Sequence, residues 1–202
     1  MGIAQSVHKL TEAEYLEIER KSEFKSEFFD GEMFAMAGGS PNHRLIASNV
    51  LGELRARLKG GRWVVYNSDL RVKIETTGLF TYPDLSVVCG QRLFFDKDSL
   101  LNPTLVAEVL SDSTEAYDRG GKFAHYRQIA TLQECLLISQ KEPRIEQFIR
   151  KADGAWEFRE ATGLGGHLEL PSLKVTLDLS EAFANVEFVP TPIRAATPPR
   201  RS

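Results

Sequence analysis

Two apolar segments of this 202-residue chain each carry one carboxylate, and this combination limits the folds and functions open to the chain. Asp84 precedes the apolar run of residues 85–89, and Glu108 lies inside the run of residues 104–110. Continuous apolar runs of this length are typical of strands that are buried on both faces of a sheet. An unpaired ion in such a strand is costly, so a neighbouring charge, a metal ion or a catalytic role has to compensate for it.

The N-terminal part of the sequence predicts a helix followed by a hairpin. Thr11 and Glu14 form a capping box, in which each side chain serves a free backbone N–H group at the start of a helix over about residues 12–21. Asp30-Gly31 between apolar-rich arms is a strong hairpin signal, because both turn positions need positive φ. Glu32 then begins the second strand of the hairpin.

A longer helix is predicted after the hairpin. Ser40 suits the N-cap and Pro41 the first helical position, and Gly60-Gly61 ends the run. Leucines recur at helical spacing between these limits, so the helix has one apolar face that can lie against a sheet.

The remaining segments predict strands, a second helix and a C-terminal hairpin. Residues 70–74 alternate apolar and basic, which is typical of a half-exposed strand, and residues 93–103 are expected to form a loop and a short helix. The other expected elements are strands over residues 63–66, 85–89, 104–110 and 135–139, a helix over about residues 120–130, an antiparallel pair over residues 144–151 and 156–161, and an edge strand over residues 175–179.

This order of elements predicts an α/β (α+β) fold in which helices flank a mixed central β-sheet. The N-terminal helix and hairpin precede the core, and the antiparallel strands extend it at the C-terminal end. We expect a single domain over residues 1–188. Residues 189–202, with four prolines, three arginines and no core pattern, are expected to form a disordered tail.

Composition gives weaker indications about partners and location. The formal net charge of −3 points mildly against a nucleic-acid binder but does not exclude one, since phosphate contacts usually come with a basic excess. No segment approaches the roughly 20 apolar residues of a membrane span, and residues 1–14 lack a signal-type apolar run, so we expect a cytoplasmic protein. Cys89 and Cys135 each lie in an apolar run and are expected to be buried, reduced thiols.

Lys122 is a third charge that is predicted to reach the two strands. On the predicted helix, Tyr126 and Ile129 lie within about 40° of Lys122, which puts Lys122 at the margin of the face that packs on the sheet. There its ammonium can neutralise Asp84 and Glu108, or it can stabilise charge during hydrolysis of a phosphate ester. A buried salt-bridge network, in which Lys122 compensates Glu108, explains the same pattern and stays open as an alternative.

The ordered set of three motifs, Tyr82-Pro83-Asp84, Glu108-Val109-Leu110-Ser111 and Asp118 through Lys122 to Tyr126, resembles the Uma family of restriction-endonuclease-like proteins in the PD-(D/E)XK nuclease superfamily. The resemblance runs from about Thr11 to Ala184. It implies a core αβββαβ fold and a divalent-metal site, for Mg²⁺ or Mn²⁺, in which Asp84 and Glu108 match the metal-binding carboxylates. The superfamily has a lysine two residues after the glutamate, where this chain has Leu110; the resemblance places the basic residue at Lys122 instead.

Three further residues are candidate auxiliary members of the site. Glu32 is a possible third metal-binding carboxylate, and the alternative is an exposed strand charge beside a turn. His43, in the first turn of the longer helix, can contact a phosphate or serve only as a surface or capping residue. Asp69, together with Arg71, can line the site from a neighbouring strand or form an exposed ion pair, which contributes little to stability.

Two other residues are expected to have structural roles: Asp118 begins the helix as an N-cap or first-turn acid, and Tyr126 packs in the core. Asp84, Glu108 and Lys122 remain as the expected catalytic residues of a metal-dependent endonuclease that hydrolyses DNA. The alternative is a nuclease-fold module with a weak or silent site and a binding or regulatory role, which the acidic balance and the missing in-strand lysine favour. A homodimer is expected, because relatives of this fold often dimerise to cut two strands, and no membrane partner is expected.

Overall fold

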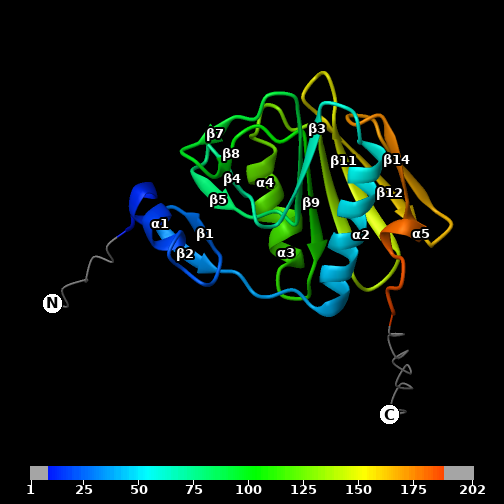
Figure 1. The fold of residues 1–202 in the computed structure, drawn as a ribbon, viewed down its shortest axis with the longest axis horizontal. Helices are drawn as coiled ribbons and strands as arrows, with labels where there is room; N and C mark the ends of the chain where they lie inside the picture. Colours follow the sequence, from blue (N-terminus) through cyan, green and yellow to red (C-terminus); the bar gives the residue numbers. More distant parts are fainter. Residues whose placement is uncertain (1–8, 189–202) are drawn as a thin grey trace, which may run out of the picture.

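The computed structural model describes residues 9–188, and a mixed six-stranded sheet forms its centre (Figure 1). β9 and β10 are parallel, and the other neighbouring pairs in this sheet are antiparallel. In sheet order, the strands are β12 (Trp156–Thr162), β11 (Arg144–Arg150), β10 (Glu134–Ser139), β9 (Leu105–Leu110), β6 (Leu85–Cys89) and β3 (Trp63–Asn67). The predicted mixed central sheet is therefore confirmed.

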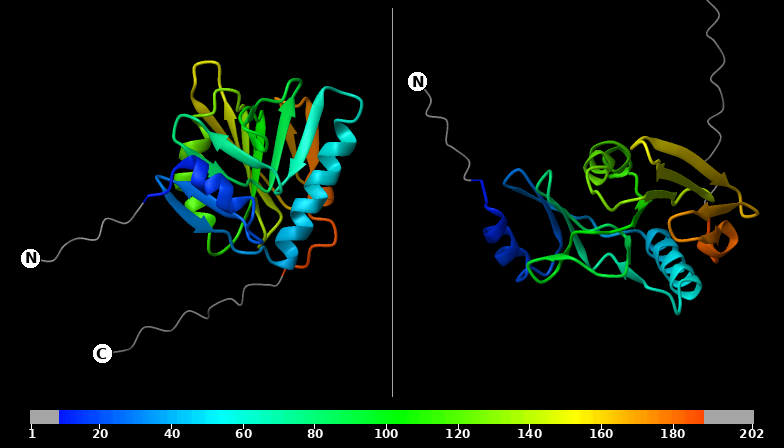
Figure 2. Two further views of the ribbon diagram at one scale, coloured as in Figure 1. Left: turned by 60° about the vertical axis from the view of Figure 1, so that its left-hand side comes forward. Right: turned by 90° about the horizontal axis from the view of Figure 1, so that it is seen from above.

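Helices cover both faces of the central sheet (Figure 2). α2 (Pro41–Arg57) lies on one face, where its buried apolar residues pack against alternate residues of β9 such as Leu105 and Ala107. The opposite face, with Val106, is covered by α3 (Glu115–Tyr117), the π-helical turn η1 (Asp118–Lys122) and α4 (Phe123–Tyr126), and by residues of a second sheet. Along the chain, α2, β3, β6, β9, the α3–α4 segment and β10 follow the αβββαβ order that the resemblance implies.

A second six-stranded sheet lies beside the first and was not predicted. Its strands, in order, are β2 (Glu32–Ala35), β1 (Ser26–Phe29), β5 (Leu79–Thr81), β4 (Arg71–Ile74), β8 (Ser99–Leu100) and β7 (Phe94–Phe95). α1 (Glu12–Glu19) packs on this sheet through an aromatic cluster of Tyr15, Phe28 and Phe80. The predicted N-terminal helix and hairpin are thus confirmed, and β1 joins them to the rest of the fold by pairing with β5.

The C-terminal strands extend the fold on the α2 side. The predicted antiparallel pair is β11 and β12. The predicted edge strand is β14 (Val175–Asp178), which pairs with β13 (His167–Leu170) in a separate two-stranded sheet. β14 leads into α5 (Leu179–Ala182), and buried residues of both elements join the core around α2.

Two predictions for the second sheet were wrong. β4 is buried at all four positions rather than half exposed, because its basic residues have partners: Arg71 donates to Tyr82 Oη at 2.9 Å, and Lys73 forms an ion pair with Glu12 at 2.7 Å. Residues 93–103 contain the short strands β7 and β8 and no helix. Arginine and lysine alternating with apolar residues therefore marked a paired, buried strand and not a solvent-facing one.

The helix predicted over residues 120–130 begins earlier and ends earlier. It starts at Glu115, widens into the π-helical turn at Asp118–Lys122, and ends at Tyr126. Gly121 packs closely under Tyr117, since a Cβ added there would lie 3.1 Å from the tyrosine ring and the ring would have to shift. Single π-turns of this kind are often found at functional sites.

The expectations for the two cysteines, a membrane-spanning helix and the C-terminal tail have different outcomes. Cys89 and Cys135 are both free thiols, but Cys89 is exposed at the end of β6, so only Cys135 is buried as predicted. Among the described residues, no helix combines the length and apolar character needed to cross a bilayer. The tail expected over residues 189–202 lies outside the described residues.

Leu136 tests the core of the central sheet. It is fully buried on β10 between neighbours on the α2 side. Leu136→Ala should lower the free energy of unfolding by about 2–5 kcal/mol, because it removes buried methyl groups and leaves a cavity. Leu164→Ala, at a position with half of its surface exposed, should change it by less than about 0.5 kcal/mol in the same urea titration. Equal effects would contradict this placement of the core.

Candidate active site

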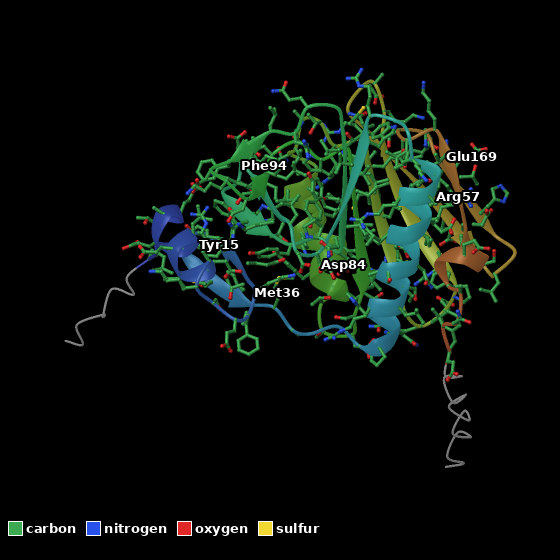
Figure 3. All side chains as sticks on the ribbon, in the orientation of Figure 1. Tyr15, Met36, Arg57, Asp84, Phe94 and Glu169 are labelled. Atoms are coloured by element: carbon green, nitrogen blue, oxygen red, sulfur yellow. The ribbon has the colours of Figure 1, made fainter. Side chains whose placement is uncertain are left out.

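Asp84 and Glu108 face each other across two neighbouring antiparallel strands. Leu85 pairs with Ala107, so one further step in the register puts Asp84 opposite Glu108. Directly opposed residues have Cβ atoms about 4.5–5.5 Å apart. Asp84 Oδ2 accepts a hydrogen bond from the backbone N–H of Val109 at 2.7 Å, which fixes the aspartate beside β9. In Figure 3, Asp84 is seen near the middle of the molecule, between α2 and the N-terminal hairpin.

Lys122 reaches this strand pair from the π-helical turn. Its Nζ lies 2.9 Å from Glu108 Oε1 and 3.7 Å from Asp118 Oδ1, and all three side chains are buried. Leu110, on the same face of β9 as Glu108, occupies the position of the superfamily lysine and packs in the core instead. The structure thus brings together Glu108 and Lys122 as the sequence predicted, with the ammonium supplied from the following helix.

Glu27 is a fourth buried member of the cluster and was missed by the sequence analysis. It lies on β1, and its Oε1 atom is 3.1 Å from Lys122 Nζ and accepts a hydrogen bond from Thr81 at 2.5 Å. The signal was present, since Glu27 directly precedes Phe28-Phe29 in the way that Asp84 precedes its own apolar run.

Glu32, the candidate third metal-binding carboxylate, lies elsewhere on the hairpin. It is exposed at the start of β2, where it pairs with Phe29, and it makes no contact with Lys122, Glu108 or Asp84 among the described residues. The hairpin therefore contributes a carboxylate to the cluster, but the carboxylate is that of Glu27.

His43 contacts the cluster from the first turn of α2. Its Nε2 atom lies 3.2 Å from Asp84 Oδ2, and both side chains are mostly buried. Burial opposes protonation of His43, but the hydrogen bond and charge of Asp84, with a smaller contribution from Asp118, raise its pKa above the ordinary value. The candidate role of His43 near the site thus agrees with its position, and the helix N-cap is Ser40.

Tyr126 and Asp118 contact the charged groups instead of serving only the roles expected for them. Tyr126 is buried in the core as predicted, but its hydroxyl also donates to Glu108 Oε1 at 2.5 Å. Asp118 was expected to begin the helix; it begins the π-helical turn inside the helical segment and faces Lys122. Positions 118, 122 and 126 are four residues apart, and all three side chains are buried.

Asp69 and Arg71 do not join this cluster. Asp69 is exposed and forms an ion pair with Lys25 at 2.6 Å, which is the alternative that the sequence left open. Arg71 is buried in the second sheet, where it binds Asp98 at 2.6 Å as well as Tyr82.

The electrostatics of the cluster are dominated by burial and by acidic neighbours. Burial raises the pKa of Glu108 above its ordinary value; Lys122 opposes this shift, and the carboxylates of Asp84 and Asp118 reinforce it. Burial also raises the pKa of Asp118, with Lys122 again opposing. Burial alone would lower the pKa of Lys122, but its three acidic neighbours outweigh burial and raise it above the ordinary value, so the lysine is an ammonium ion.

The donor set around Asp84 and Glu108 suits a hard divalent cation. Within residues 9–188, the contacts of Glu108 all use Oε1 and those of Asp84 all use Oδ2, which leaves one oxygen of each carboxylate available. In the same residues, no group of three or more His, Cys, Asp and Glu side chains has the arrangement of a complete metal site. Mg²⁺ commonly binds one or two carboxylates and keeps several waters, so a two-carboxylate set fits it.

The chain is similar in sequence or in fold to several known proteins. Two uncharacterised proteins of Synechocystis sp. (strain ATCC 27184 / PCC 6803 / Kazusa) are similar to the chain: slr1290 is 38% identical over 89% of this chain and 94% of its own length, and sll1609 is 34% identical over 87% and 100%. A crystal structure described as "a putative nuclease belonging to DUF820", from Anabaena variabilis ATCC 29413, has a TM-score of 0.68 at 18% identity and covers 85% of this chain and 96% of that one, which shows a shared fold.

A family model decides the assignment. The model described as "Uma2: Putative restriction endonuclease" matches residues 12–182, which include both sheets, the carboxylates of β1, β6 and β9, and Lys122. The chain therefore belongs to the Uma2 family of restriction-endonuclease-like proteins.

Proposed function

We propose that this protein is a metal-dependent endonuclease that hydrolyses phosphodiester bonds of DNA, with Asp84, Glu108 and Lys122 as its catalytic residues. One observation carries the proposal: a buried ammonium lies 2.9 Å from Glu108, and Asp84 faces that same glutamate across β6 and β9. Two carboxylates that can hold a metal ion, with a cation beside them, suit metal-assisted hydrolysis of a phosphodiester. The choice of DNA over RNA follows the family description.

Asp84 and Glu108 would hold Mg²⁺ or Mn²⁺ through the carboxylate oxygens that the protein leaves available. When bound, such an ion supplies positive charge that polarises a phosphate and favours ionisation of water. Lys122 then stabilises negative charge that develops on the phosphate, because its ammonium is buried and already oriented. His43 and the N–H of Val109 hold the Asp84 carboxylate in place from two sides.

The binding or regulatory module is the second candidate function. Its supporting observation is that Lys122 already has three acidic neighbours, as a purely structural salt-bridge network would require. The charge count favours a site instead. Glu27, Glu108 and Asp118 contact Lys122, and Asp84 adds a fourth carboxylate through its contact with His43. Clustered carboxylates repel each other unless one of them takes up a proton or a further cation is bound, so the cluster favours binding of a cation.

We also propose that the protein acts as a homodimer, because cutting both strands of a duplex needs two such sites. Its support is that each chain carries one candidate active site among the described residues. Light scattering at micromolar concentration measures the mass directly, and a monomeric mass would contradict the homodimer.

Nicking of supercoiled plasmid tests the enzyme assignment. With Mn²⁺, the wild-type protein should convert supercoiled DNA to the nicked form, and EDTA should stop the reaction. Asp84→Ala, Glu108→Ala and Lys122→Ala should each lower the rate by at least about a hundredfold, because each removes a group needed in the transition state. Glu160→Ala, an exposed carboxylate on edge strand β12, is the matched control and should cleave like the wild type. Activity that survives in the Asp84 and Glu108 variants would show that a contaminant or another site is responsible.

Binding of Mn²⁺ separates the enzyme from the silent module without using activity. A ligand that binds only the folded protein raises its melting temperature. Mn²⁺ should therefore raise the melting temperature of the wild type and of Glu160→Ala, but not that of Asp84→Ala or Glu108→Ala. Equal shifts in all four proteins would mean that the cation binds somewhere other than β6 and β9.

Glu27 and Glu32 decide which carboxylate of the hairpin serves the site. Glu27→Gln removes a charge that orients Lys122, so nicking should slow by about tenfold or more, since small displacements of catalytic groups are expensive. Glu32→Gln, on the same hairpin but exposed, should slow it by less than about twofold. The reverse order of effects would favour Glu32 as the third metal-binding carboxylate.

A further inference from the structure

The free edge of the central sheet is bordered by basic side chains. β3 is the last strand of that sheet and pairs only with β6. Four exposed residues lie around it, on the last turns of α2, before β3 and after β6: Arg55, Lys59, Arg62 and Arg92. We call these four residues and the outer side of β3 the β3 basic edge.

None of the four basic residues forms an ion pair within the part of the chain that the structure describes. Arg55 donates to the backbone carbonyl of Val65 at 3.1 Å, and Arg92 donates to the Tyr66 hydroxyl at 3.4 Å. The guanidinium of Arg62 lies against Gly90, where an added Cβ would be 2.9 Å from Nη2. Neutral partners therefore position three guanidinium groups without compensating their charge.

A neighbouring arginine shows that acidic partners are used elsewhere on the same helix. Arg57 lies two residues after Arg55 and pairs with Glu53 at 3.2 Å and Asp178 at 2.8 Å. The chain as a whole has a formal net charge of −3, so a local group of four uncompensated cations does not follow from composition. Such a group creates a positive potential that attracts polyanions.

Protection of an edge strand is the simpler explanation for charge at this position. Lysines and arginines beside an edge strand discourage pairing with another chain. Protection needs one or two charges that project from the strand itself. Here the charges come from three separate segments and contact Val65 and Tyr66 of β3 and the neighbouring Gly90, which suits an extended anionic ligand better.

We propose that the β3 basic edge binds the phosphate backbone of the DNA on which the candidate active site acts, some distance from the bond that is cut; this inference rests on the proposed function. β6 connects the two places, since Asp84 precedes its first residue and Cys89 ends it next to Trp63 of β3. Five residues of strand span about 17 Å. Phosphates along one strand of B-DNA are about 3.4 Å apart along the axis, so about five nucleotides separate the cut from these contacts.

Duplex binding at several salt concentrations tests the proposal. The probe is a fluorescein-labelled 20-base-pair duplex in EDTA, which allows binding without cleavage, and the readout is anisotropy. The triple variant Arg55→Gln, Arg62→Gln, Arg92→Gln should bind about tenfold or more weakly at low salt. The slope of log Kd against log salt should fall by about 2–3, because each lost phosphate contact removes roughly one unit.

A second triple variant controls for net charge. Arg127→Gln, Lys151→Gln, Arg159→Gln removes the same number of charges from exposed positions at the α4 and β12 side of the molecule. It should keep the wild-type salt slope. Equal losses in the two triple variants would mean that binding follows total charge and not the β3 basic edge, and would overturn the proposal.

Cys89 reports contact at the β3 basic edge independently of any substitution. The sequence contains two cysteines, and Cys135 is buried, so an alkylating reagent modifies Cys89 in the folded protein. A saturating amount of the duplex should slow alkylation of Cys89 several-fold in wild-type protein and in Asp84→Ala alike. An unchanged rate under saturation would place the DNA elsewhere. Slower alkylation at high protein concentration without DNA would identify the edge as an interface between two copies and would likewise overturn the proposal.

The outcomes for this edge and for the active site can be told apart. If Asp84→Ala loses nicking and the first triple variant keeps the wild-type salt dependence, the nuclease assignment is supported and DNA binding at the β3 basic edge is contradicted. Salt-dependent binding through the edge in a protein that does not nick DNA would overturn the nuclease and leave a DNA-binding surface.

Discussion

The ion pair between Lys122 and Glu108 is the interaction on which the site depends. Neither charge can be buried alone, because an uncompensated ion in the interior costs several kcal/mol. To bury both charges, a helix must place the lysine beside Glu108 of β9, and the π-helical turn at Asp118–Lys122 places Lys122 there. They also require a hairpin that supplies Glu27 from the other side. The second sheet, which pairs β1 with β5, holds that hairpin in position.

The sequence predicted the central sheet well because its strands carry a strong signal. β6, β9 and β10 are buried on both faces, so their apolar runs stand out from the polar segments around them. The position of Lys122 was also predictable, since helical periodicity placed it on the margin of a packing face. The charges inside apolar runs were the features that pointed to the site, and they would have pointed to Glu27 as well had β1 been longer.

Other features depend on contacts between distant segments, which periodicity does not contain. Arg71 and Lys73 make β4 look like a solvent-facing strand, but Tyr82, Asp98 and Glu12 pair with them and allow their burial. The helical segment begins at Glu115, earlier than expected, so Asp118 lies inside it, in the π-helical turn and beside Lys122. Short strands such as β7 and β8 exist only because β4 provides a partner.

Net charge is a poor guide to this molecule because its charges are segregated. Carboxylates gather in the interior around Lys122, and arginines that have no ion pair among the described residues gather around β3, where they face solvent. The first group makes the protein acidic, and the second attracts the kind of polymer that an acidic protein should repel. The formal net charge of −3 therefore shows neither the acidic cluster nor the basic edge. Under the proposed function, a metal ion bound between Asp84 and Glu108 would shift that balance at the place where a phosphate would approach, so cation binding and substrate binding would support each other.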